Sequence, residues 1–447
     1  MLIPVVVAST ASHAHLAGTL LPRGFFLGLG LTYLLALALD RLAVHWRLPG
    51  AVAILLLGLA IPSDLVAGAN PLGSRQLESL HLVSLALLIF YAGLRTDVHR
   101  IRGMTGVGLR LGSLGLLITI ALAGLALQGL APLLPGGLPP AAAWLLVCCL
   151  AATDSGALDD LLVTLRHGVS GRLSHLLHFE AALSTLVALL CFGVLAAMLQ
   201  VHGHSEHQAL HAVLASRLPG QLGAVGLHLL AGVAAGTVVG GLAPRLIDAL
   251  VRSDQQLLLV AVALAFVAFG LGQFLGGGGL IAVYGAGVFL SNGQYRIKRF
   301  EQQDLARVMH PFNTAAEVTV LLLLGFLVKP AAVLTVLPLG LLLAIVVPLA
   351  RLAAVWIVVP AAAFPKRQRL ILAGCGLRAA VPMALAVSMT EELPHLRGIA
   401  AAAVEPLGER LLALMFVVVL TDLLLQSLLV QRLLGAAPAG SAQPAAD

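Results

Sequence analysis

The sequence predicts an all-α polytopic membrane protein, and its composition, its long apolar runs and the placement of its basic residues support that prediction. Of the 447 residues, 60% are hydrophobic and only 10% are charged. A soluble protein of this length does not need so much apolar surface, so we expect most of the chain to lie in a lipid bilayer. The net charge of +6 does not indicate nucleic-acid binding, because the position of Lys and Arg matters more than their sum in membrane proteins.

Apolar runs, separated by polar breaks or by breaks that contain Pro and Gly, predict about thirteen membrane helices of roughly 17–25 residues each. We place them at residues 24–43, 49–66, 80–95, 106–130, 141–165, 174–200, 221–244, 255–274, 278–292, 311–328, 330–359, 370–390 and 408–431. Together they form one predicted transmembrane domain over residues 1–434. Residues 435–447 are rich in Ala, Pro and Gly, and we expect a short disordered tail there.

Lys and Arg gather in alternate connections between the predicted helices. This asymmetry predicts that the N-terminus lies outside and the C-terminus inside. We expect a multi-pass protein of the cell inner membrane. The predicted inside connections contain Arg41, Arg47, Arg95, Arg100, Arg102, Arg166, Arg172, Arg245, Arg252, Arg296, Lys298, Arg299, Arg307, Lys366, Arg367 and Arg369. The outside positions contain fewer basic residues, namely Arg23, Arg75, Arg217, Lys329, Arg397 and Arg410.

The apolar run at 141–165 is interrupted by four residues, Thr153, Asp154, Ser155 and Gly156. An ionised carboxylate near the middle of a bilayer costs about 2.5–3.5 kcal/mol on insertion scales, so such a residue faces a cavity or a partner. Ser and Gly weaken helical continuity, and broken helices with a carboxylate near the midplane form the ion sites of many secondary transporters. Asp154 is therefore a candidate ion-binding residue; the alternative is a buried aspartate that a neighbouring helix satisfies.

A second candidate acid, Glu180, precedes Ser184 and Thr185 by about one helical turn. A carboxylate with hydroxyls four and five residues along the same helix offers several oxygens to a small hard cation. The alternative interpretation of Glu180 is a salt bridge that only holds helices together.

Arg378 lies in a second interrupted apolar run, where Gly374, Gly376 and Pro382 flank it. A permanently charged arginine in a membrane needs an anionic partner. The candidates for that partner are Asp154, Glu180 and Glu317. Two broken segments, one in each half of the chain, are typical of transporters built from inverted repeats, with the site between the two breaks.

Other ionisable positions support weaker interpretations. Asp159 and Asp160 either line a cytoplasmic funnel or reach the membrane interface, and Asp422 is a possible auxiliary residue that faces the bundle. The loop 201–220 contains four histidines, which we interpret as an exposed polar loop rather than a metal site: His202, His204, His207 and His211. Dinucleotide, Walker and zinc-ligand patterns are absent, so the sequence predicts neither a cofactor nor a resident metal, and an intramembrane enzyme has little support.

Several stretches of the chain resemble the monovalent cation/proton antiporters, the sodium/proton exchanger superfamily. They include ATDSGALDDLL, GLIAVYGAGVFLSN and GLRAAVPMALA, of which the last two are the most specific. The resemblance implies a thirteen-helix fold with a core domain, a dimerisation domain and two broken helices that cross in the core. It also implies elevator-like alternating access and a homodimer. Thr153 and Asp154 match the Thr-Asp of the first broken helix, Arg378 matches the arginine of the second, and Glu317 matches a glutamate found in some members.

The chain departs from the family pattern at its sixth predicted helix. Aligned without gaps to the family's E-S-x-x-N-D, the segment puts Glu180 on the Glu, Ser184 on the Asn and Thr185 on the final Asp, so the usual ion-carrying carboxylate is missing. In a second possible register, Glu180 falls on the ion-binding Asp of the potassium-efflux branch. Both registers leave Asp154 and Glu180 as the principal acids.

The first hypothesis is therefore exchange of a monovalent cation, Na⁺ or K⁺, for protons across the lipid bilayer. In it, Asp154 and Glu180 are the exchanging acids, and Thr153, Ser184 and Thr185 are neutral oxygen ligands. The second hypothesis is a member of the same fold that senses or scaffolds and has lost transport together with the Asp at position 185.

Overall fold

A computed structural model describes residues 25–45, 49–61, 74–97, 103–133, 137–164, 169–199, 210–276, 278–293, 302–396 and 399–435. Within these residues the regular structure is helical. The first half contains α2 (Phe25–His45), α3 (Gly50–Ala60), α5 (Ser74–Leu94), α6 (Thr105–Arg110), the π-helical turn η1 (Leu111–Gly115), α7 (Leu116–Leu130), η2 (Ala131–Leu133), α8 (Pro140–Ala151), α9 (Ser155–Thr164) and α10 (Gly171–Leu199). The second half contains α11 (Leu210–Leu250), α12 (Asp254–Phe274), α13 (Gly279–Ser291), α14 (Gln302–Leu327), α15 (Pro330–Val358), α16 (Lys366–Gly374), α17 (Ala380–Glu392), η3 (Leu393–His395) and α18 (Ala401–Gly435).

Every predicted membrane segment overlaps one of these helices or a pair of them. Eight helices in the described part of the chain are long and apolar enough to cross a membrane, and three shorter apolar helices accompany them. The largest difference in length is at α11, which has 41 residues where we predicted 221–244. The number of helices that cross the membrane stays a prediction, and most of the predicted tail lies outside the described residues.

The helices pack in two groups. The α14 group consists of α2, α3, α5 and α11 to α14, and the crossing group consists of α6 to α10 and α15 to α18. In the α14 group, glycines let helices approach closely: a Cβ atom on Gly58 of α3 would lie 2.6 Å from a backbone oxygen of α14, and one on Gly93 of α5 would lie 2.6 Å from a backbone oxygen of α13. Such small-residue contacts are how helices associate in lipid, where the hydrophobic effect between them is absent.

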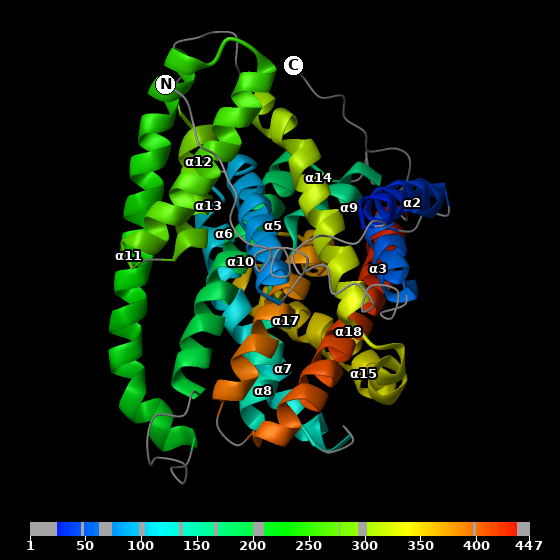
Figure 1. Ribbon diagram of the computed structural model, residues 1–447. Helices are drawn as coiled ribbons and strands as arrows, with labels where there is room; N and C mark the ends of the chain where they lie inside the picture. The colour runs from blue at the N-terminus through cyan, green and yellow to red at the C-terminus, as the bar shows by residue number, and fades with distance from the viewer. Residues whose placement is uncertain are drawn as a thin grey trace, which may run out of the picture.

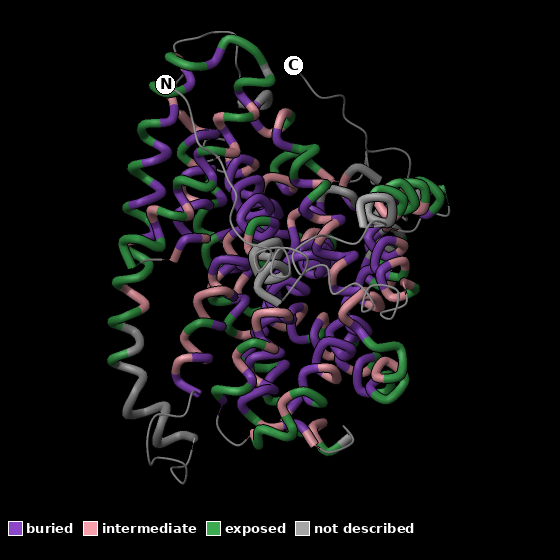
Figure 2. The backbone as a smooth tube through the Cα atoms, in the orientation of Figure 1, coloured by how far each residue is buried: buried purple, intermediate pink, exposed green. Residues whose placement is uncertain are grey.

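Burial separates the enclosed helices from those at the edge of the molecule. Figure 1 shows α11 along one long edge, and Figure 2 shows buried residues concentrated in the middle of the bundle. In the most apolar window of Pro140–Leu158, which includes α8 and the start of α9, 89% of the residues are buried, against 28% in Gly223–Leu250 of α11. The first broken helix is thus surrounded by protein, whereas most of the apolar window of α11 is not buried by the rest of the chain.

The two predicted interruptions are present, and they contact each other. The first lies between α8 and α9, and the second between α16 and α17. The backbone N–H of Asp154 donates to the carbonyl of Leu377 at 2.8 Å, and the Arg378 side chain donates to the carbonyl of Leu150. The expectation that two broken helices meet in the core is therefore confirmed, and we call this place the crossing.

Candidate functional site

The Asp154 carboxylate caps two helices at the crossing. Its Oδ1 accepts the backbone N–H of Gly156 at 2.8 Å, at the start of α9. Its Oδ2 accepts the backbone N–H of Val381 at 3.0 Å, at the start of α17. Helix N-termini have unpaired N–H groups and a partial positive charge, so both ends stabilise the anion. Asp154 is 2% exposed, and backbone groups rather than a cationic side chain hold its charge.

An arginine occupies the C-terminal end of each interrupted half-helix. Arg378 donates through Nε to the Leu150 carbonyl at the end of α8. Arg351 donates to the carbonyls of Leu372 at 3.2 Å and Ala373 at 3.3 Å, at the end of α16. Helix C-termini carry a partial negative charge and unpaired carbonyls, which a guanidinium satisfies. The crossing is therefore arranged with an anion at its two N-termini and cations at its two C-termini.

The partner of Arg378 is Asp422 of α18. Arg378 Nη1 lies 2.6 Å from Asp422 Oδ2, and both side chains are fully buried. Our three candidates for this partner, Asp154, Glu180 and Glu317, were wrong. The reason is geometric: the Arg378 side chain extends along the end of α8 toward α18, while Asp154 is held by backbone groups on the far side of the interruption. Asp422 does face the bundle, as the sequence suggested.

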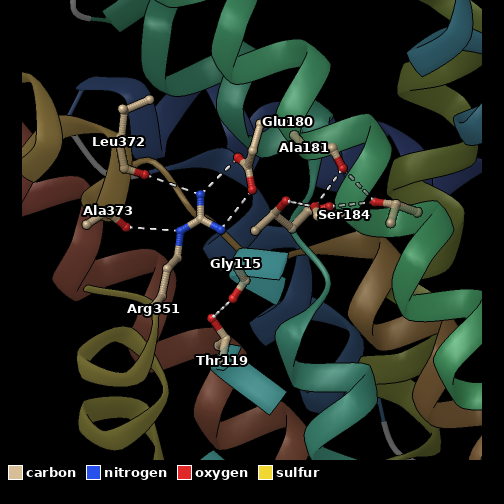
Figure 3. A network of polar contacts seen from close by, with 10 residues as sticks. Gly115, Thr119, Glu180, Ala181, Ser184, Arg351, Leu372 and Ala373 are labelled. Atoms are coloured by element: carbon tan, nitrogen blue, oxygen red, sulfur yellow. Dashed lines mark hydrogen bonds and ion pairs between the residues drawn. The ribbon is translucent and has the colours of Figure 1, made fainter. Parts of the chain in front are cut away.

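Glu180 forms a buried salt bridge with Arg351 of α15. The pair is bidentate, with Nη1–Oε1 at 3.0 Å and Nη2–Oε2 at 2.9 Å, and Figure 3 shows the carboxylate directed at the guanidinium. Room for Arg351 comes from Gly376, because a Cβ atom there would lie 2.0 Å from Arg351 Nε. Arg351 was not among the residues predicted for the site, although it is the one charged residue of the predicted helix at 330–359 and was recognisable on that ground.

The three predicted hydroxyl ligands lie together where the first interruption meets α10. Thr185 donates to the Thr153 carbonyl at 2.8 Å and also to the Ala181 carbonyl at 3.0 Å. Ser184 donates to Ala181 at 2.9 Å and hydrogen-bonds the Thr153 hydroxyl. A hydroxyl keeps acceptor lone pairs when it donates, so this cluster still offers oxygens to a cation beside Asp154.

Glu317 approaches the same place from α14. A Cβ atom on Gly156 would lie 2.8 Å from Glu317 Oε2 and 3.3 Å from Asp154 Oδ1. Glu317 is thus near Asp154 and belongs to the other helix group. Asp159 and Asp160 lie on α9, but their side chains are outside the described residues, as are three residues of the histidine loop, His202, His204 and His207.

The buried side chains of the crossing carry more negative than positive charges. At the crossing, three buried carboxylates, of Asp154, Glu180 and Asp422, lie among two buried guanidiniums, of Arg351 and Arg378, which leaves a formal net charge of −1 before Glu317 is counted. A third buried arginine, Arg369 near the start of α16, lies instead over the Trp356 ring. Because each guanidinium already has a carboxylate partner, the excess negative charge lies on Asp154. One proton or one monovalent cation is sufficient to neutralise it.

The chain is similar to known proteins over most of its length. The sequence model described as "Sodium/hydrogen exchanger, transmembrane" matches residues 30–436. The chain is 25% identical over 373 residues to the Na⁺/H⁺ antiporter NhaS2 of Synechocystis sp., covering 81% of this chain and 63% of NhaS2. It is 23% identical over 360 residues to the K⁺/H⁺ antiporter NhaP of Alkalimonas amylolytica, covering 80% and 59%. The chain thus spans about three-fifths of the length of these relatives.

The fold has a solved counterpart. The sodium proton antiporter MjNhaP1 of Methanocaldococcus jannaschii superposes with a TM-score of 0.71 at 18% sequence identity, covering 90% of this chain and 94% of that one. At this identity the match supports the fold alone.

Proposed function

The chain belongs to the sodium/hydrogen exchanger family, and from that premise we propose that it exchanges Na⁺ or K⁺ for protons across a membrane by alternating access. The observation that carries the proposal is the position of Asp154. It is a buried carboxylate whose charge is held by two helix N-termini, with no guanidinium partner among the described residues. Such a group can release its ligand without leaving a cationic side chain unpaired.

Competition for Asp154 then explains exchange. A proton and a metal cation neutralise the same negative charge, so they bind one at a time. An ionised carboxylate is costly to move through an apolar barrier, so the crossing group changes its access only when Asp154 is neutralised. Thr153, Ser184 and Thr185 supply neutral oxygens for the cation.

In this proposal Glu180 has the second of the two roles considered for it, a salt bridge that holds helices together, and it is not an exchanging acid. Its bidentate contact with Arg351 leaves no oxygen free of the guanidinium, so we assign Glu180 to the support of the crossing and Asp154 to the exchange itself. Glu317 approaches Asp154 from the α14 group, and we propose that it is a second acid that the crossing group passes when its access changes. We also propose that the protein is a homodimer in the cell inner membrane.

Transport by the purified protein tests the proposal. Proteoliposomes with an imposed pH gradient should lose that gradient when Na⁺ or K⁺ is added, and a comparison of the two ions identifies the cargo. If neither ion dissipates the gradient, cation/proton antiport is wrong for this chain.

The second candidate is a sensor or scaffold without transport, and Thr185 is the observation that favours it. Its hydroxyl occupies the position where the family pattern has an ion-carrying Asp. If the native protein is inactive and Thr185→Asp creates transport, this second function replaces the first.

A further inference from the structure

The environment of Arg378 raises a question that cation exchange by Asp154 does not answer. Arg378 follows Leu377, whose carbonyl accepts the backbone N–H of Asp154, and it precedes by three residues Val381, which donates to the Asp154 carboxylate. The backbone around Arg378 therefore wraps Asp154. Its side chain nevertheless extends to α8 and α18. An arginine so close would neutralise Asp154 permanently if its side chain turned inward.

Two residues of α18 hold the side chain in its observed position. Asp422 accepts Arg378 Nη1 on Oδ2 at 2.6 Å, and its Oδ1 accepts the side-chain amide of Gln426, one turn further along the same helix. Asp422 is fully buried and Gln426 is 2% exposed. A buried carboxylate is costly unless it is paired, and here both of its oxygens are engaged in orienting the guanidinium.

Arg378 keeps unused hydrogen-bonding capacity. Within the described part of the chain, its buried Nη2 has no acceptor, and the buried Oε1 of Gln426 has no donor. A guanidinium has five N–H donors in a fixed fork, so the contact with Asp422 does not saturate it. Without Asp422 the side chain would have both the charge and the free donors to pair with another carboxylate.

We propose that Asp422 and Gln426 are positioning residues for cation exchange: they keep Arg378 at the end of α8 and thereby leave the Asp154 carboxylate available to cation and proton. The proposal rests on the proposed function and deepens it. It predicts that α18 sets the charge at the site without any contact to the transported ion.

The Asp422→Asn variant tests this directly. Loss of the counter-charge leaves Arg378 as an excess positive charge near Asp154, which repels Na⁺, K⁺ and H⁺ alike. We expect the half-saturating concentrations of cation and of proton to rise together by about tenfold, the factor that one unit of proton affinity represents. The maximal rate per folded molecule should change less. A purely structural role would reduce the active fraction and leave both half-saturation values unchanged.

Rescue and control variants make the test specific. Removing the excess charge in Asp422→Asn/Arg378→Gln should return both half-saturation values toward wild type, and Asp422→Glu should retain most of the wild-type affinity. Gln426→Leu should shift both values in the same direction as Asp422→Asn, by a smaller factor. The matched control is Glu409→Gln, which removes another α18 carboxylate, one that is partly exposed and paired with the exposed Lys329, and it should match wild type.

Each outcome decides a separate claim. If wild type exchanges cations and Asp422→Asn has unchanged half-saturation values, the positioning role is wrong while the antiport function stands. If Asp422→Asn does not fold, the half-saturation values of Asp422→Glu, Gln426→Leu and the double variant decide in its place. The proposal is supported if the double variant has the same half-saturation values as Arg378→Gln alone. A wild-type protein that exchanges nothing overturns the antiport function and this inference with it.

Discussion

Asp154 and Glu180 are both buried acids of the crossing group, yet their charges are balanced in different ways. Asp154 receives backbone N–H groups from two helix N-termini, whereas Glu180 receives both terminal nitrogens of Arg351. The dipolar ends stay in place whether or not the carboxylate is protonated, so Asp154 can change its ligand at little structural cost. Protonation of Glu180 would leave the buried guanidinium of Arg351 without its counter-charge. One acid is therefore suited to exchange and the other to support.

The largest expected effect comes from Asp154→Asn. Asn has one acceptor oxygen where Asp has two, so either Gly156 of α9 or Val381 of α17 loses its side-chain cap, at a cost of about 1 kcal/mol. Both helices should still form, and the melting temperature should fall by only a few degrees. The charge that binds the cation is lost, and cation-driven proton transport should fall to background, by about a hundredfold or more. Paired measurements of transport and thermal unfolding check this. Retained transport would show that the two acids have the opposite roles.

Glu180→Gln should show the reverse pattern, a loss of stability. It leaves Arg351 buried without a counter-charge, and breaking a buried ion pair in this way costs about 3–5 kcal/mol. Thermal unfolding in detergent measures the loss. The double variant Glu180→Gln/Arg351→Met removes both charges and should recover part of the stability and measurable transport, because replacing a buried pair by neutral groups is often close to neutral. Recovery should be incomplete, because the carbonyls of Leu372 and Ala373 lose the donors that Arg351 supplied. If the double variant folds well but transports nothing, Glu180 takes part in exchange.

Residue types and apolar periodicity were sufficient to predict most of the fold. Each predicted segment overlaps a helix, and the interruptions at Asp154 and Arg378 were recognisable because polar residues and glycines break otherwise continuous apolar runs. Lengths were less predictable. The chain between 210 and 220 contains Arg217 and Pro219, which indicated a loop, but α11 begins at Leu210.

The pairing of the site residues was not predictable from the sequence. The sequence offered three acids as candidate partners of Arg378. Distance along the sequence did not show which of them pairs with it, nor did it indicate Asp422, which is 44 positions away. Arg351 was visible as a lone charge in an apolar run, but its partner depends on how α15 packs against α10 and α16. Helix positions follow from local patterns, whereas ion pairs depend on tertiary packing.

Thr185→Asp sharpens the contrast between the two acids by adding a third beside the first. Thr185 donates to the carbonyl of Thr153, so the new carboxylate would lie next to the Asp154 interruption with no guanidinium partner. We expect tighter cation binding, by about tenfold, together with lower stability at neutral pH when no cation is present, because like charges repel in a buried site. Cation-dependent shifts of the melting temperature measure both effects. An unchanged response to cations would place position 185 outside the site.

The smallest effect is expected from Lys329→Ala, which removes the exposed partner of Glu409, a partly exposed acid of α18. Their contact raises the pKa of Lys329, because a hydrogen bond and the nearby negative charge of Glu409 favour the protonated amine. A raised lysine pKa contributes stability that is present at neutral pH and is lost only in the alkaline range, as the pH rises through the folded-state value. Lys329→Ala should therefore leave the pH profile of transport unchanged below that range, since water screens exposed pairs. Transport measured from acidic to alkaline pH checks this, and a shift near neutral pH would show that Glu409, and not only the buried Asp154, adjusts the exchange.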